Sequence, residues 1–158
     1  ALVNEPEIVL LDEPTTGLDP QARHLVWERL FRLKQQGVTL VLTTHYMDEA
    51  EQLCDRLVVM DGGLIVAEGS PAELIERYST REVLELRFPP GEAPRAEDLA
   101  PHVERVEELP DRLLLYTADG ERAQAAVARA GHHPLSALVR RSSLEDVFLR
   151  LTGRSLVE

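Results

Sequence analysis

The sequence predicts an α/β fold, in which a parallel sheet with covering helices is followed by a smaller α+β unit. Apolar runs typical of buried strands occupy residues 8–11 and 38–42, and a helical pattern from Pro20 to Gly37 lies between them. This strand–helix–strand order is typical of parallel strands joined by a crossover. Beyond residue 79 the apolar residues alternate with polar ones, which predicts strands with one buried face.

Composition places the chain among ordinary globular proteins. It has 158 residues, 44% of them hydrophobic and 28% charged, which is enough to form a buried core. The formal net charge of −11 argues against a phosphate-backbone partner, so no nucleic acid is expected to bind. The single cysteine, Cys54, excludes an internal disulfide and fits a reducing cytosol. No apolar run approaches the roughly 20 residues that a membrane-spanning helix requires.

In the first half, each expected element has its own local signal. The first strand is apolar throughout and is therefore expected to be buried on both faces. Asp19 precedes Pro20, a pair typical of a capped helix start, and Gly37 ends that helix. His24 and Trp27 lie within it and are interpreted as packing or surface residues. The other expected elements are a strand at 38–42, a short helix at 47–54 with Met47, Ala50, Leu53 and Cys54 on its buried side, a hairpin of strands 57–60 and 64–67, and a helix at 71–78 capped by Ser70 and Glu73.

The second half has the order β-α-β-β-α-β followed by a terminal helix, which is typical of a ferredoxin-like domain. We therefore expect residues 1–78 to form part of a first domain and residues 79–158 to form a ferredoxin-like accessory domain. Ser142 and Glu145 are expected to form the capping box of the terminal helix. The expected elements are strands at 84–88, 103–109, 113–117 and 135–141 and helices at 96–100, 121–130 and 144–151.

The second half contains no expected catalytic group. His132 and His133 lack converging ligands and are interpreted as a polar turn rather than a metal site. Arg140 and Arg141 form too small a basic cluster to indicate nucleic acid. We therefore interpret this half as a binding or docking module.

The chemistry is expected where the two apolar runs of the first half end. Asp12 and Glu13 follow the first run and His45 follows the second, and parallel strands bring such residues to one edge. An acid at this position can hold Mg²⁺ on nucleotide phosphates, and a neighbouring acid can orient a water molecule. Simpler interpretations remain open: a solvated strand end for the acids, a loop position for His45, a helix cap for Asp19 and a turn for Gly17.

Taken together, these segments resemble the motifs of ATP-binding cassette (ABC) ATPases. Residues 8–20, IVLLDEPTTGLDP, are similar to the Walker B strand and D-loop, and residues 40–51, LVLTTHYMDEAE, resemble the switch-histidine segment. Residues 61–63 and 68–71 resemble the hairpin and helix that close such a cassette. Residues 144–156 resemble the carboxyl-terminal tail of exporter-type members, including the daunorubicin-resistance group. The implied fold is a partial P-loop NTPase cassette.

The resemblance implies a role for each residue at this edge. Asp12 is implied to be the metal ligand for Mg²⁺, Glu13 the catalytic base for water, and His45 the contact to the γ-phosphate of ATP. A second ABC ATPase subunit, in a homodimer, is expected to contact the loop formed by Gly17, Leu18 and Asp19.

The implied function is that of an ATP-hydrolysing subunit of an ABC exporter, of which this chain is a carboxyl-terminal portion. Such a subunit couples ATP hydrolysis to export of a drug-like or lipid-like substrate through separate transmembrane permease subunits. It is expected in the cytoplasm, held on the inner face of the membrane by those subunits. The alternatives are a non-transport ABC ATPase and a truncated, non-catalytic partner for dimerisation or regulation.

The sequence lacks three motifs of this family: the G-x-x-x-x-G-K-[ST] phosphate loop, the glutamine loop and the Gly-rich signature motif. The amides and lysine of a phosphate loop supply most of the binding energy for ATP. We therefore predict that the 158-residue chain by itself neither binds nor hydrolyses ATP. Titration with a fluorescent ATP analogue tests this, and retention at micromolar concentration would contradict it.

Overall fold

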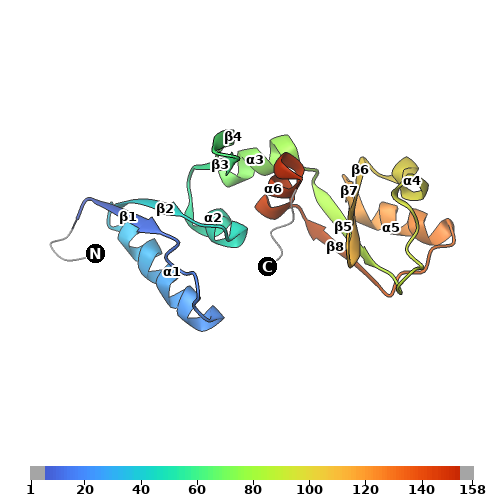
Figure 1. Ribbon diagram of the computed structural model, residues 1–158, viewed down its shortest axis with the longest axis horizontal. Coiled ribbons are helices and arrows are strands. Elements are labelled where there is room, and N and C mark those ends of the chain that lie inside the picture. The colour runs from blue at the N-terminus through green and yellow to red at the C-terminus, as the bar shows by residue number, and fades with distance from the viewer. Residues whose placement is uncertain (1–5, 154–158) are drawn as a thin grey trace.

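The computed structural model describes residues 6–153, so positions 154–156 of the tail motif lie outside the described part. Figure 1 shows three groups of elements along the longest axis: β1, β2 and α1; then α2, α3, α6 and the β3–β4 hairpin; then the sheet of the second half. The elements in chain order are β1 (Ile8–Asp12), α1 (Pro20–Gln35), β2 (Thr39–Thr43), α2 (Met47–Leu53), β3 (Leu57–Asp61), β4 (Leu64–Gly69), α3 (Pro71–Tyr78), β5 (Glu82–Arg87), α4 (Ala96–Leu99), the 3₁₀ helix η1 (Ala100–His102), β6 (Arg105–Leu109), β7 (Arg112–Thr117), α5 (Gly120–Arg129), β8 (Ser136–Arg141) and α6 (Leu144–Thr152).

The expected parallel pairing of the first two strands is confirmed. β1 pairs with β2 in a register that sets Ile8 opposite Thr39 and Asp12 opposite Thr43. Helix α1 connects the two strands and packs against β2 and α2. β1 ends at Asp12 and β2 ends at Thr43. Because the strands are parallel, Asp12, Glu13 and the segment that leads to His45 therefore lie at the same edge of the sheet.

The expected burial of β1 on both faces is wrong. Val9 is only 4% exposed, but Ile8 and Leu10 on the opposite face are 61% and 74% exposed. Val41, paired with Leu10, is 53% exposed as well. The apolar run makes the strand suitable for burial on two faces, but the described helices cover one face and leave the other open (Figure 1).

The middle group follows the sequence closely. β3 and β4 form an antiparallel hairpin whose turn contains Gly62 and Gly63, both with positive φ. The side chain of Glu73 accepts a hydrogen bond from the Ser70 amide at 2.9 Å, and the Glu73 amide donates to the Ser70 hydroxyl at 3.3 Å. This capping box starts α3 where the sequence predicted it.

The second half forms a four-stranded antiparallel sheet in the order β6-β7-β5-β8. Chain order and strand order together give the predicted ferredoxin-like arrangement, in which the first and third strands of the unit, β5 and β7, occupy the centre. One face packs against α5 and the α4–η1 segment. The core on that face consists of Leu84, Leu86, Leu99, Leu113, Leu115, Ala123 and Val127.

Part of the other face of this sheet is also covered, which corrects the prediction of strands with one buried face. Val83 and Tyr116, which point away from the first core, are both 0% exposed and form a cluster with Leu149 of α6. The alternation in the sequence identified the face packed against α5, because the polar residues Glu85 and Arg87 lie on the opposite side. It did not reveal that α6 returns to cover part of that polar side.

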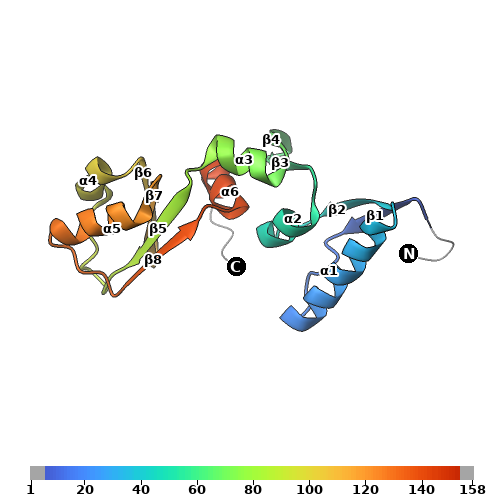
Figure 2. The same ribbon diagram turned by 180° about the vertical axis from the view of Figure 1, so that it is seen from behind.

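Helix α6 also packs against the first half of the chain. Leu144 and Val147 of α6 share a buried cluster with Ala50 of α2 and Leu74 of α3. Figure 2 shows α6 directly below α3, with the sheet of the second half to one side of both helices. The division into two domains at residue 79 stays a prediction. Helix α6 packs against elements from both sides of that boundary: α2 and α3 before it, and the sheet after it.

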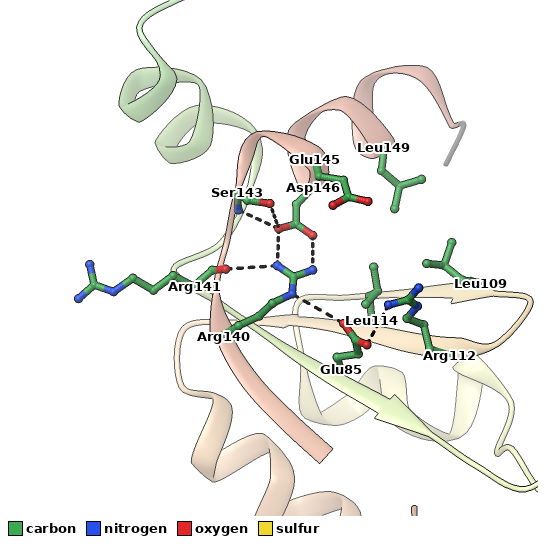
Figure 3. Close-up of a pocket in the computed structure, with 10 residues that line it drawn as sticks. All are labelled: Glu85, Leu109, Arg112, Leu114, Arg140, Arg141, Ser143, Glu145, Asp146 and Leu149. Carbon is green, nitrogen blue, oxygen red and sulfur yellow. Dashed lines mark hydrogen bonds and ion pairs between the residues drawn. The ribbon is translucent and has the colours of Figure 1, made fainter. Parts of the chain in front are cut away.

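The expected capping box of α6 is displaced by one residue. Its capping residue is Ser143, whose amide donates to Asp146 Oδ2 at 2.8 Å, while Ser142 accepts a hydrogen bond from the Ser79 hydroxyl at 3.0 Å. Arg140 donates to the two oxygens of Asp146 at 2.7 and 2.9 Å, as Figure 3 shows. This bidentate ion pair and the Ser143 contacts hold Asp146, rather than Glu145, in the capping position.

Asp146 makes the stability of this region depend on pH. Burial opposes ionisation of its carboxyl, but the hydrogen bonds from Arg140 and Ser143 outweigh burial and lower the pKa of Asp146. A carboxyl whose pKa is lower in the folded chain contributes stability above the pKa of the unfolded chain. That contribution is lost as the pH falls through the folded pKa.

We predict that Asp146→Asn lowers the free energy of unfolding by about 3 kcal/mol at pH 7, because it breaks a buried ion pair. The difference from the unsubstituted chain should begin to shrink as the pH falls below about 4, where the carboxyl of the unfolded chain becomes protonated, and should disappear once the pH is below the lowered pKa of the folded chain. Urea unfolding followed by circular dichroism at pH 7 and pH 3 measures this. Glu145→Gln, at the exposed neighbouring position, is the matched control. An equal loss at both pH values would contradict the prediction.

Candidate functional site

The carboxyl edge of the β1–β2 sheet brings together the ends of both strands. Asp12 and Thr43 are register partners, and the Thr43 hydroxyl donates a hydrogen bond to the Asp12 carboxylate. The Glu13 amide continues the pairing and donates to the Thr43 carbonyl oxygen at 3.0 Å. Asp12 is exposed at this edge, where a ligand has access to its carboxylate.

Glu13 turns sharply away from the strand. Its φ of 43° lies in the left-handed region, which is unusual for a residue with a side chain and is often found at functional sites. One carboxylate oxygen lies 3.4 Å from His45 Nδ1, and the other accepts a hydrogen bond from the Thr16 hydroxyl at 3.1 Å. The structure thus brings together Glu13 and His45, which are far apart in the sequence.

The turn after Glu13 leads into α1. Asp19 caps that helix, because its Oδ1 accepts from the amides of Gln21 and Ala22 at 2.9 and 3.0 Å. Gly17 has a φ of 78°, and Leu18 is 36% exposed. The cap is a described contact, whereas the dimer role of Gly17, Leu18 and Asp19 stays a prediction.

Sequence reasoning missed a buried acid next to this edge. Glu49, on α2, is 0% exposed, and its Oε1 accepts hydrogen bonds from the Thr15 hydroxyl and Trp27 Nε1, each at 2.8 Å. Thr15 is itself 0% exposed. A signal for this burial was present, because Glu49 precedes Leu53 by four residues and therefore shares the apolar side of the helix.

The donor set at the edge fits a magnesium ion. An exposed carboxylate and an adjacent hydroxyl, Asp12 and Thr43, are hard oxygen ligands, and Mg²⁺ on a nucleotide needs only one or two protein carboxylates. Within residues 6–153 there is no group of three or more His, Cys, Asp or Glu side chains that would hold a metal ion without a nucleotide. The Asp12 carboxylate thus has the chemistry to hold such an ion, and its role as metal ligand stays a prediction.

A cavity of about 230 Å³ lies away from this edge, between α6 and the sheet of the second half (Figure 3). Its guanidinium groups include Arg112, which donates to Glu85 at 2.9 Å, and Arg140, which pairs with Asp146. Burial opposes the charge of Arg112, but its acidic partners raise the pKa of that group. Because these two cations already have acidic partners, this cavity is part of the ion-pair network that holds α6.

Two known sequence families match parts of the chain. Residues 92–153 match the carboxyl-terminal domain of the nodulation factor export protein NodI. Residues 1–47 match an AAA domain family described with the AbiEii toxin of a type IV toxin–antitoxin system. The first match covers most of the ferredoxin-like unit and α6, and the second covers β1, α1 and β2.

Curated relatives match almost the entire chain. A Nod factor export ATP-binding protein I from Rhizobium sp. (strain N33) is 51% identical over 156 residues, which are 99% of this chain and 50% of that protein. The protein of the same name from Burkholderia thailandensis is 52% identical over 157 residues, again 99% of this chain and 50% of its own length. This chain belongs with the ATP-binding subunits of ABC transporters. It spans about half the length of the curated relatives it matches, and it corresponds to a carboxyl-terminal portion.

Solved structures of the same family resemble the chain over a smaller part. An ATP-binding subunit of an ABC transporter is 34% identical, with a TM-score of 0.42, over 46% of this chain and 30% of that one. CbiO1 from Clostridium perfringens, described as part of the complex cbiONQ, is 37% identical with a TM-score of 0.43, over 48% of this chain and 30% of its own. Among the residues that the structure describes, every helix is too short or too polar to cross a lipid bilayer.

The cap of α1 gives a direct test of the turn. We predict that Asp19→Ala lowers the free energy of unfolding by about 1 kcal/mol, because two amides of the first helical turn lose their acceptor. Asp19→Asn is the matched control, since asparagine caps helices about equally well. Thermal unfolding followed by circular dichroism compares the variants. An asparagine variant as unstable as the alanine variant would show that the cap is not the source of the effect.

Proposed function

We propose that this chain is a carboxyl-terminal portion of the ATP-hydrolysing subunit of an ABC exporter, in which the β1–β2 edge forms one wall of the ATP site. The observation that carries the proposal is the contact of Glu13 with His45, 3.4 Å apart, beside the exposed Asp12 carboxylate. The open face of β1, with Ile8 and Leu10 exposed, supports it too, because a parallel sheet is normally covered on both faces.

Each residue at the edge has a chemical task in this proposal. Asp12, aligned by the Thr43 hydroxyl, would hold the metal ion, and a bound Mg²⁺ would supply charge neutralisation at the phosphates of ATP. Glu13 orients the attacking water and accepts its proton as general base. His45 donates a hydrogen bond to the γ-phosphate and aligns Glu13 through their mutual contact.

A second ATP-binding subunit would complete the site. The exposed residues Gly17, Leu18 and Asp19 follow Glu13 after three intervening residues of the same turn, so a partner that contacts them also approaches the water that Glu13 would orient. We propose a homodimer with this turn at the interface. Asp19 would then serve the interface and cap α1 at the same time.

The names of the relatives support a proposal for the cargo and the membrane partners. Because the curated relatives at 51% and 52% identity are named for Nod factor export, we propose export of a substrate of that kind through separate permease subunits. The drug-like or lipid-like cargo expected from the sequence stays a prediction. The subunit would act in the cytoplasm, at the inner face of the membrane, with residues 79–158 as its accessory domain.

The proposal is tested in a complete subunit, made by joining the amino-terminal half of the Rhizobium relative to this chain. We predict that Glu13→Gln lowers kcat for ATP about 100-fold or more, because the general base is lost, and preserves ATP-driven dimerisation. Steady-state ATPase assays and size-exclusion chromatography measure both effects.

Glu7→Gln is the matched control, since Glu7 is an exposed acid just before the other end of β1. Its turnover should equal that of the unsubstituted subunit. Normal turnover in the Glu13→Gln subunit would overturn the proposed function. A subunit that hydrolyses ATP without any effect of permease subunits would favour the non-transport ABC ATPase.

A further inference from the structure

The buried acid Glu49 has no task in the proposed mechanism, yet three elements meet at its side chain. It lies on α2, the helix that begins two residues after His45. Its Oε1 accepts from Thr15, in the turn between Glu13 and α1, and from Trp27 in the second turn of α1. One carboxylate oxygen thus joins the turn, α1 and α2.

The second carboxylate oxygen of Glu49 indicates that the stability of the fold does not explain why an acid occupies this buried position. Oε2 is buried and makes no hydrogen bond to any described residue. A buried carboxylate oxygen without a partner costs free energy, and an apolar residue of similar size would avoid that cost. A residue that costs stability at the edge of a candidate active site is more readily explained by a role in that site.

The contacts of Thr15 show what that role is. The Thr15 carbonyl oxygen accepts from the Leu18 amide at 3.1 Å, and the Glu13 carbonyl oxygen accepts from the Thr16 amide at 3.2 Å. These bonds close the turn on itself, so the hydrogen bond from Thr15 to Glu49 ties the whole turn to α2. The base and the dimer-facing residues are thereby held at a fixed distance from the helix that follows His45.

We propose that Glu49 is a positioning residue. Through Thr15 it holds Glu13 within contact distance of His45 and fixes the position of residues 17–19 relative to α2. The inference rests on the proposed function, because it deepens the account of the same site. Glu49 is 0% exposed, so a ligand at the edge of the sheet does not reach its side chain, and its effect falls on alignment rather than on binding.

The test compares kcat and KM for ATP in the joined subunit used above. Glu49→Leu removes the acceptor and should lower kcat about 100-fold, the effect expected of a misplacement of about 1 Å, with KM nearly unchanged. Glu49→Gln keeps the Oε1 acceptor and should restore kcat to within about threefold of the unsubstituted subunit. Such a rescue separates positioning from a need for the negative charge.

Glu51 provides the matched control on the same helix. Its Oε2 accepts from the Leu144 amide at 3.0 Å, so it contacts α6 and not the turn. Glu51→Leu should therefore leave kcat unchanged, although it weakens the contact with α6. A fall in kcat equal to that of Glu49→Leu would show that any damage to α2 is sufficient, and would overturn the proposal.

A second pair of variants tests the same contact if Glu49→Leu does not fold. Thr15→Val keeps the shape of the side chain but removes the donor and should lower kcat, whereas Thr15→Ser keeps the donor and should not. Trp27 is the single tryptophan of the 158-residue chain, so its fluorescence, measured in that chain without the joined half, reports on the same carboxylate. Its emission should change in Glu49→Leu and stay as it is in Glu49→Gln.

The two proposals fail in different ways. If the unsubstituted subunit is active and Glu13→Gln is not, the proposed function stands; normal kcat in Glu49→Leu or Thr15→Val then overturns only the role of Glu49. If the unsubstituted subunit has no ATPase activity, both proposals fall.

Discussion

Asp12 and Thr43 end two parallel strands in the same register, and the rest of the candidate site depends on that pairing. The hydrogen bond between their side chains and the bond from the Glu13 amide to Thr43 continue the ladder beyond the strands. Glu13 therefore leaves the sheet beside the segment that leads to His45. A shift of one residue in this register would move the acids to the other face and separate them from the histidine.

Helix α2 transmits this arrangement to the rest of the chain. On one side it reaches the turn through Glu49, and on another it packs its apolar residues against α3 and α6. Glu51 accepts a hydrogen bond from the first residue of α6, Leu144. The helix that follows His45 is thus in direct contact with the helix that covers the ferredoxin-like sheet.

Helix α6 owes its position to a buried ion pair as well as to apolar packing. Asp146 is 1% exposed and pairs with Arg140, while Leu149 and Val147 pack toward opposite sides of the helix, onto the sheet and onto the α2–α3 cluster. Because a buried pair is costly unless its geometry is good, its two hydrogen bonds restrict where α6 begins. This arrangement explains how a helix from the end of the chain contacts both halves.

Local signals in the sequence determined most elements and the candidate edge. The Ser70–Glu73 capping box, the Asp19 cap and the Gly62–Gly63 hairpin turn were predictable, because each is formed by residues at most three apart. Spacing and resemblance likewise identified Asp12, Glu13 and His45 as candidates, whose roles stay predictions.

Only the tertiary structure decided which surfaces are covered and which polar groups are buried. Glu49 meets Thr15 and Trp27 from 34 and 22 positions away, and Val83 is buried by a helix more than 60 residues downstream along the sequence. The capping of α6 by Ser143 rather than Ser142 depends on the ion pair of Arg140 with Asp146 and on the contact of Ser142 with Ser79. Except for Arg140, which lies six residues from Asp146, the partners in these cases are distant in sequence, and local propensity and periodicity do not record them.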